Sequence, residues 1–157
     1  MNKEKLIKLT PINEAKRDER SINSNLEILY VHLIKYRFAS DTQDSNWVDS
    51  IHKSIINLKG ELSNKTQYTK LLNSIHKILN KSIDRAILEM KVKSNKIVRK
   101  AVIEKEINND QDLNWTNIES LINRNILGNW LYKYYNLNSF QANSIKNALN
   151  NHFNQFK

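Results

Sequence analysis

The chain has 157 residues, with 25 Lys and Arg against 16 Asp and Glu, and it has no cysteine, which excludes disulfides and thiolate chemistry. Two glycines and one proline are too few for a turn-rich β-sandwich or barrel, so we expect one helical domain over residues 1–157. No apolar run reaches the roughly 18 residues of a membrane span, and the charged N-terminus lacks a signal peptide's apolar core, so we expect a cytoplasmic protein with no membrane contact.

The first predicted helix begins at Thr10-Pro11, where Thr caps free N–H groups and Pro suits the first turn. Its apolar residues recur every seven positions with others between them, which predicts one buried stripe: Ala15, Ile22, Leu26, Leu29, Leu33 and Tyr36. A polar break at 40–45 precedes a second helix, which Asp44 or Ser45 caps and which ends near Gly60.

A third helix is predicted over about 67–90, with apolar residues on one face and cations on the other. Residues 91–105 fit a further helix or, as the less favoured alternative, a β-hairpin that turns at Ser94-Asn95.

Residues 108–112 are expected to form a loop. Thr116 and Glu119 have the spacing of a capping box, which predicts a helix that ends near Gly128. Ser139 is expected to cap a terminal helix. These patterns predict an all-α bundle of about five helices with a short C-terminal helical extension over residues 128–157.

One family resemblance runs through the predicted helices. Residues 26–36, LEILYVHLIKY, look like the "LExLLxHLLKW" helix of a bacterial family catalogued as domain of unknown function twenty-nine. Trp47 to Ile51 resembles its "WxxTI" helix start, residues 67–90 fit its next long helix, and residues 114–119 correspond to its "PYTxEQ" segment. The similarity covers roughly residues 15–119. This sequence lacks the arginine pattern that follows the Trp in the family, and it lacks the family's Pro-rich segment. Residues 128–157 look like an addition to the family's helices. The resemblance implies an all-helical fold and no activity.

The positive charge is concentrated in the middle of the chain. Residues 1–64 have a net charge of +1, residues 65–105 of +8 and residues 106–157 of 0. A basic face of this kind tracks phosphates, so nucleic acid is the first candidate partner, with an acidic protein as the second and a merely solvated lysine face as the alternative to both. The residues predicted to bind are Lys70, Lys77, Lys81, Arg85, Lys93, Lys96, Arg99 and Lys100.

Eight of the thirteen aromatic residues follow residue 114. The rings between 130 and 135 do not all fit on one buried face, which favours a protein interface, in a homo-oligomer or a hetero-complex, made by Trp130, Tyr132, Tyr134 and Tyr135. The equally weighted alternative is that the last helix folds back and covers them.

No catalytic residue, metal site or cofactor is predicted. The four histidines lack metal-binding spacing, and His32, near Lys35, is interpreted as a packed histidine in preference to an acid/base group. The leading hypothesis is therefore a non-enzymatic binding module with a basic face. The alternative is an assembly subunit that acts through its aromatic C-terminal region.

Overall fold

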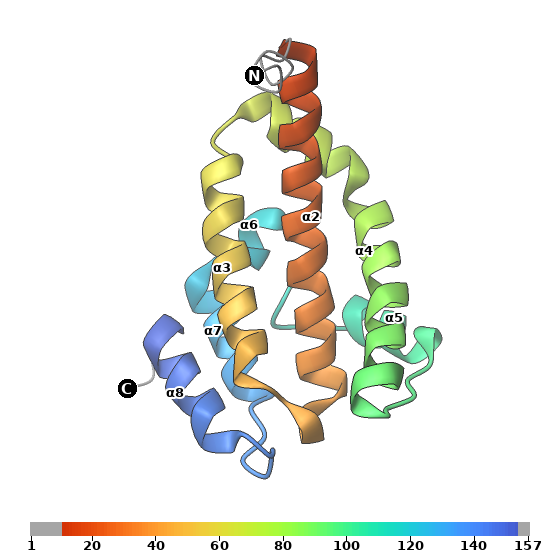
Figure 1. Cartoon of the computed structure of the whole chain (residues 1–157), viewed down its shortest axis with the longest axis vertical. Coiled ribbons are helices and arrows are strands. Elements are labelled where there is room, and N and C mark those ends of the chain that lie inside the picture. The colour runs from red at the N-terminus through yellow and green to blue at the C-terminus, as the bar shows by residue number, and fades with distance from the viewer. Residues whose placement is uncertain (1–10, 154–157) are drawn as a thin grey trace, which may run out of the picture.

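The computed structural model describes the backbone of residues 11–153 and the side chains of residues 21–153 (Figure 1). Over this range the chain is all-α, with seven α-helices, one short 3-10 helix and no strand. The elements are α2 (Pro11–Phe38), η1 (Ser40–Thr42), α3 (Ser45–Glu61), α4 (Lys65–Ser94), α5 (Lys100–Asn108), α6 (Ile118–Leu121), α7 (Arg124–Lys133) and α8 (Ala142–Phe153). The prediction of a helical fold is confirmed, with more helices than expected. Thr10, the expected first cap, lies outside the described residues.

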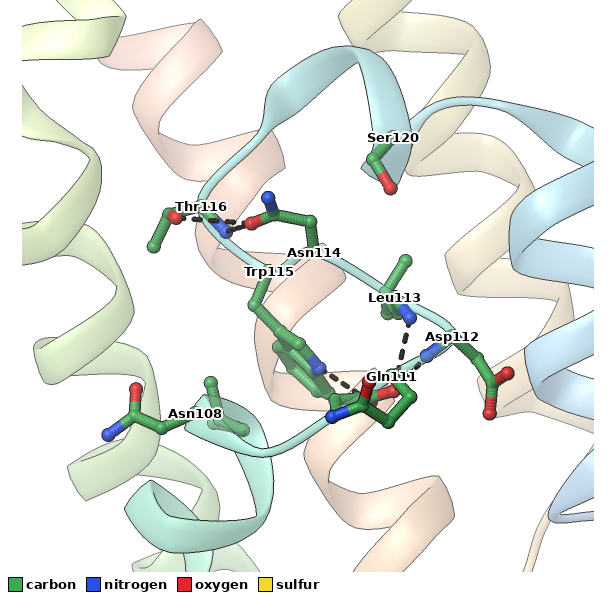
Figure 2. Close-up of a pocket in the computed structure, with 10 residues that line it drawn as sticks. Asn108, Gln111, Asp112, Leu113, Asn114, Trp115, Thr116 and Ser120 are labelled. Atoms are coloured by element: carbon green, nitrogen blue, oxygen red, sulfur yellow. Dashed lines mark hydrogen bonds between the residues drawn. The ribbon is translucent and has the colours of Figure 1, made fainter.

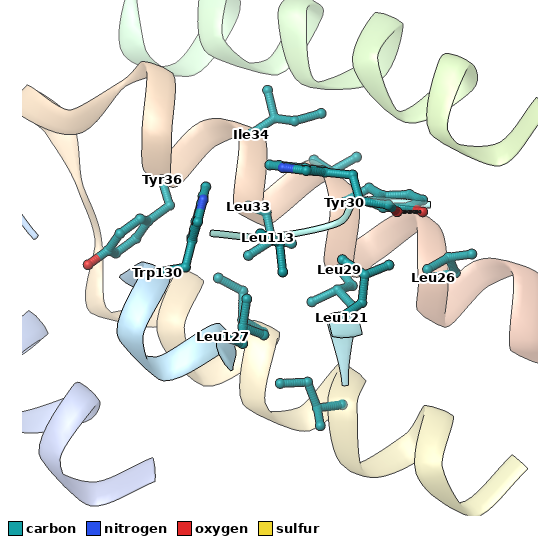
Figure 3. Packing of buried hydrophobic residues seen from close by; sticks show 14 of the residues in the cluster. Leu26, Leu29, Tyr30, Leu33, Ile34, Tyr36, Leu113, Leu121, Leu127 and Trp130 are labelled. Carbon is teal, nitrogen blue, oxygen red and sulfur yellow. Dashed lines mark hydrogen bonds between the residues drawn. The ribbon is translucent and has the colours of Figure 1, made fainter. Parts of the chain in front are cut away.

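α2 is the central helix of the bundle, because α3 and α4 both pack along it (Figure 1). From Ile22 onward the predicted stripe is buried, but so are Tyr30, Val31 and Ile34 on other sides of the helix. The side chain of Ala15 lies outside the described residues. Segments from residues 113–131 supply the additional cover, and Figure 3 shows Trp130 beside Tyr36 in this part of the core. The predicted stripe is therefore correct but incomplete, because other segments cover α2 on more than one side.

Asparagine and aspartate side chains begin the next two helices. Asp44 accepts a hydrogen bond from the backbone N–H of Asn46 at 2.8 Å and begins α3, as one of the two predicted caps. Asn64 accepts from the N–H groups of Thr66 and Gln67 and begins α4.

α4 ends at Ser94 and is capped by Asn95, which has a positive φ of 51°. This left-handed residue lets the N–H of Lys96 donate to the carbonyl of Met90 at 3.0 Å, the type of bond that terminates many helices. The chain then turns into α5, so residues 91–105 hold the end of one helix and the start of another. The prediction that residues 91–105 are helical is therefore correct apart from the connection between the two helices, and this segment forms no hairpin.

Three predicted helix boundaries near the C-terminus were wrong. Asn117, and not Thr116, caps α6 by accepting from the N–H of Ser120. Asn123 begins α7, which runs through Gly128 instead of ending there. Asparagine side chains thus cap the starts of α6 and α7.

Ser139 also does not cap the last helix. Its buried hydroxyl donates to the carbonyl of Gln43 at 3.1 Å, and α8 begins three residues later. α8 packs against α3 and α7 through Ile145, Leu149 and Phe153. The C-terminal extension therefore belongs to the same hydrophobic core as α2.

Candidate nucleic-acid interface

The eight predicted phosphate-binding cations lie on α4, on the connection that follows it and at the start of α5. A helix repeats its faces every 3.6 residues, so the steps of seven, four and four bring Lys70, Lys77, Lys81 and Arg85 to one side of α4. All four are exposed, and Lys81 and Arg85 lie at the edge of the buried stripe of that helix, within reach of Glu27 on α2.

Glu27 of α2 binds two cations of this row. Its carboxylate lies 2.8 Å from Arg85 and 3.3 Å from Lys81, and its side chain is only 15% exposed. Burial opposes the ionisation of Glu27, but hydrogen bonds and charge from Arg85 and Lys81 outweigh it and lower its pKa. The middle of the predicted face therefore contributes to the packing of α2 on α4.

Glu89 of α4 extends the same ion-pair network inward. It lies 2.9 Å from Lys35, 2.8 Å from Arg85 and 3.7 Å from Lys93. Burial raises its pKa, but hydrogen bonds from Lys35 and Arg85 prevail and bring the pKa to about 2. Lys35 has a side chain only 7% exposed, so this carboxylate neutralises a cation inside the protein.

Two cations beyond α4 are also paired. Lys96 lies 3.2 Å from Asp41, and Lys100 lies 2.9 Å from Asp84. Lys77 and Arg99 form no ion pair with a described residue, and Lys70 is exposed. The structure therefore brings the predicted residues to one flank of the molecule, but five of the eight form ion pairs with carboxylates of the protein itself.

These ion pairs lower the positive charge that the face offers to a partner, but they leave several of its cations exposed. Lys81 and Lys93 remain 72% and 69% exposed, and a surface ion pair contributes only about 0–1 kcal/mol. An incoming phosphate can replace such a partner. Arg85, with two carboxylates at 2.8 Å, is the least available of the row.

The predicted aromatic interface is mostly covered. Trp130 is 1% exposed and lies in the core, so it has no surface to offer a partner. The three tyrosines are half-buried: the Tyr132 hydroxyl donates to Asn150 and the Tyr135 hydroxyl to the carbonyl of Ala142 at 2.9 Å, while the Tyr134 ring lies 4.4 Å from the Arg37 guanidinium. These contacts agree with the fold-back alternative.

Asp110 is a structurally central residue that no sequence pattern singles out. Its Oδ2 accepts the indole N–H of Trp115 at 3.0 Å and that of Trp130 at 2.8 Å, and its Oδ1 accepts two backbone N–H groups of the loop. Since the carboxylate is fully engaged, it is a packing element and not a free ligand.

A polar pocket of about 460 Å³ opens beside this loop (Figure 2), and its lining includes Asp112, Asn114 and Thr116.

The histidines hold no arrangement that suggests catalysis. His32 shares a hydrogen bond of 2.8 Å with the carbonyl of Ile28, and burial lowers its pKa. His52 stacks on His152 with ring centroids 4.1 Å apart, and Asp49 lies 2.8 Å from the His152 ring. Residues 21–153 contain no cluster of three or more side chains suited to bind a metal ion. Within the same range, no helix has the length and apolar character to cross a bilayer.

Comparison with known proteins places the chain in a family. The model of the family described as "Domain of unknown function DUF29" matches residues 12–116, which is about two thirds of the chain and includes α2, α3, α4 and α5. No curated protein and no solved structure matches the chain. The matched range and the helical fold together establish that this protein is a member of the DUF29 family.

Proposed function

We propose that this protein is a non-enzymatic helical binding module whose basic face, residues 65–105, meets an anionic partner, with nucleic acid as the first candidate. The observation that supports the proposal most is the remaining excess of charge. Eleven cations of this segment face its own three acids and the two that α2 and η1 contribute, Glu27 and Asp41. The face stays positive even with all of these carboxylates paired.

The geometry suits a rod-like polyanion. Lys70 and Arg85 are separated by fifteen residues on one straight side of α4, which spans about 22 Å at the usual helical rise of ~1.5 Å per residue. Phosphates along a duplex follow one another closely enough to meet several cations of such a row. The proposal includes a bacterial origin and a cytoplasmic location. A chain without cysteine fits the reducing interior of a cell and supports the location alone.

A titration with fluorescently labelled DNA duplex, single-stranded DNA and RNA tests this function. Binding should weaken steeply from about 50 to about 300 mM salt, because each phosphate contact releases counterions. Replacing Lys70, Lys77 and Lys81 by Gln should reduce the salt slope by about 0.9 for each phosphate of duplex DNA that is no longer neutralised.

A second triple variant provides the matched control. Lys53, Lys59 and Lys146 are exposed lysines on α3 and α8, so replacing them by Gln removes the same charge from other faces of the protein. Equal affinity loss in both variants would mean that only net charge matters and would contradict a specific basic face. Absence of binding at low salt would dismiss the nucleic-acid proposal.

The alternative proposal is an assembly subunit joined through its aromatic C-terminal region. It has weaker support, because Trp130 is buried and the neighbouring tyrosines bond within the chain. Sedimentation velocity decides between a monomer and a stable oligomer, and a strictly monomeric protein over a wide concentration range rules out homo-oligomeric assembly.

A further inference from the structure

The four most exposed large apolar side chains lie on loops and helix ends at one end of the bundle. Phe140 is 92% exposed, Ile97 80%, Leu137 74% and Val92 72%. They come from the α7–α8 connection and from the junction between α4 and α5. Isolated exposed apolar residues are ordinary on protein surfaces, but four that gather at one end call for a physical explanation.

Hydrogen bonds and an ion pair tie these segments together. Lys96, in the α4–α5 connection, lies 3.2 Å from Asp41 of η1. On the other side of η1, the Asn136 side chain donates to the carbonyl of Ser40 at 3.1 Å. The connections α2–α3, α4–α5 and α7–α8 therefore meet at one end, which is the lower end in Figure 1. We call residues 36–46, 90–100 and 133–146 the loop end.

The exposure of Phe140 and Leu137 is built into a well-bonded loop. Gln43 donates to the carbonyl of Tyr134 at 2.8 Å and accepts the N–H of Asn136 at 3.2 Å. Its own backbone carbonyl accepts the hydroxyl of Ser139 at 3.1 Å. Further along, the side chain of Gln141 accepts both the N–H and the hydroxyl of Ser45.

This bonding holds the loop on both sides of Phe140. The bonds hold the backbone around Phe140, so the entropy of ordering the loop has been lost before any partner arrives. The bonded backbone groups also need no water, so they do not resist transfer toward an apolar medium.

The segments of the loop end also contain more basic than acidic residues. Its three segments contain eight Lys and Arg and two acids, Asp41 and Asp44. Five of these cations pair with carboxylates, four of which lie outside the loop end, so the excess of positive charge rests mainly on Lys91, Arg99 and Lys146. Such an excess repels a second copy of the same surface and attracts an anionic one. Along the chain, Val92 and Ile97 stand among Lys91, Lys93, Lys96 and Arg99.

We propose that the loop end docks on the surface of an anionic lipid bilayer, with Phe140 and Leu137 entering the headgroup–acyl boundary and the surrounding Lys and Arg meeting lipid phosphates. A fluid bilayer accepts separate protruding side chains without a complementary pocket, which a protein partner would have to supply. Duplex nucleic acid would meet the cations but gives no burial to Leu137, Ile97 or Val92.

The combination of features matches what peripheral binding requires. One short apolar anchor gives marginal attachment, and stable attachment takes a second contribution such as a polybasic patch. The expectation of no membrane contact rests on the lack of a spanning segment in the sequence, and peripheral docking needs no such segment. The proposal shares the cations of residues 93–100 with the proposed nucleic-acid face, but its apolar contacts lie outside the Lys70–Arg85 row, so substitutions of Leu137 and Phe140 separate the two proposals.

Vesicle co-sedimentation of the full chain tests the proposal. Vesicles that contain equal parts of phosphatidylglycerol and phosphatidylcholine should pull the protein down, and pure phosphatidylcholine should not. The double variant Leu137→Ser, Phe140→Ser should partition at least about tenfold more weakly, because each buried apolar side chain contributes more than one factor of ten. The variant Ile56→Ser, at an exposed position on α3 away from the loop end, is the matched control and should bind normally.

A fluorescent probe reports insertion directly. Phe140→Trp should show a blue-shifted emission with the anionic vesicles and none with nucleic acid. Protein that stays in the supernatant, binding that the double serine variant retains in full, or an emission of the introduced tryptophan that does not move would each overturn the proposal. If the protein stays in the supernatant, a protein partner becomes the remaining candidate for the loop end. Because both serine substitutions replace exposed side chains, unchanged thermal unfolding should verify that the variants are folded.

Discussion

The ammonium group of Lys35 lies 2.9 Å from the carboxylate of Glu89, inside the contact between α2 and α4. The same ammonium lies 5.1 Å from the centre of the Trp47 ring on α3. One buried cation thus touches all three long helices. Lys35 and Trp47 both lie within the range that the family model matches, and their contact helps to fix how the three helices pack.

Replacing Glu89 by Gln should therefore destabilise the fold strongly. The substitution leaves Lys35 buried without a counter-ion. Breaking a fully buried pair costs about 3–5 kcal/mol, and because solvent reaches part of Glu89 we expect about 1–3 kcal/mol here. Urea unfolding followed by circular dichroism measures the change. The control is Glu104→Gln on the exposed surface of α5, for which we expect less than about 0.5 kcal/mol. Equal stability of the two variants would show that water reaches Lys35 freely.

The same carboxylates predict how stability depends on acid. The pKa of Glu89 is lowered to about 2 and that of Glu27 is lowered as well, so both groups stabilise the folded state above their unfolded pKa of about 4.5. That stabilisation is lost as the pH falls toward 2. After allowance for solvent screening we expect a loss of about 1–2 kcal/mol from Glu89. The Glu89→Gln variant should show a shallower decline in the unfolding free energy, and a parallel decline would contradict this assignment.

Local patterns predicted the first half of the molecule better than the second. The seven-residue stripe of α2 and the cap at Asp44 are encoded within one or two helical turns, so they are legible in sequence. The capping residues Asn117 and Asn123 were missed because asparagine is abundant in this chain and many positions look alike. Choosing among them requires the tertiary packing that sets where each short helix begins.

The candidate site shows the same division. Helical spacing places Lys77, Lys81 and Arg85 on one side of α4, as the structure does. It carries no information on Glu27, 58 residues before Arg85, which neutralises part of that row. Likewise, no spacing rule indicates that Trp130 is buried while Phe140 is exposed, since this depends on the loop that Gln43 holds in place.

Removing the carboxylate of Asp110 should disrupt the packing of two tryptophans. Asp110→Ala leaves the indole N–H groups of Trp115 and Trp130 without acceptors, and each buried unsatisfied donor costs about 1–3 kcal/mol. We expect a total loss of about 2–4 kcal/mol and a change in tryptophan emission. Asp112→Ala, which removes only an exposed ion pair with Lys133, is the control. An unchanged emission spectrum in Asp110→Ala would refute the role of this carboxylate.

Asn95 should tolerate glycine better than alanine. Its φ of 51° places a Cβ in a left-handed conformation that costs most residues about 1–2 kcal/mol, and asparagine and glycine less. Asn95→Ala should therefore lower the unfolding free energy by about 1 kcal/mol, while Asn95→Gly leaves it equal or higher. Chemical denaturation of the two variants side by side makes the comparison, and the reverse order of stability would show that α4 ends differently.

The stacked rings of His52 and His152 should make the packing of α8 on α3 sensitive to mild acid. Burial lowers the pKa of His52, as do the nearby charges of His152 and Arg124, while Asp49 acts in the opposite direction. A histidine with a lowered pKa supports the fold above its unfolded value of about 6.5 and ceases to do so as the pH falls below it.

The unfolding free energy should therefore drop between pH 7.5 and pH 5.5, by less than about 1 kcal/mol for this partly exposed ring. His52→Phe keeps a ring for stacking but cannot take up a proton, so it should lose part of that dependence. Burial also lowers the pKa of His32, so the variant should keep the part of the pH dependence that His32 contributes. His76→Phe, at an exposed site on α4, is the control and should keep the pH dependence of the unaltered protein. If both variants follow the same pH curve, protonation of His52 does not weaken the contact between α3 and α8.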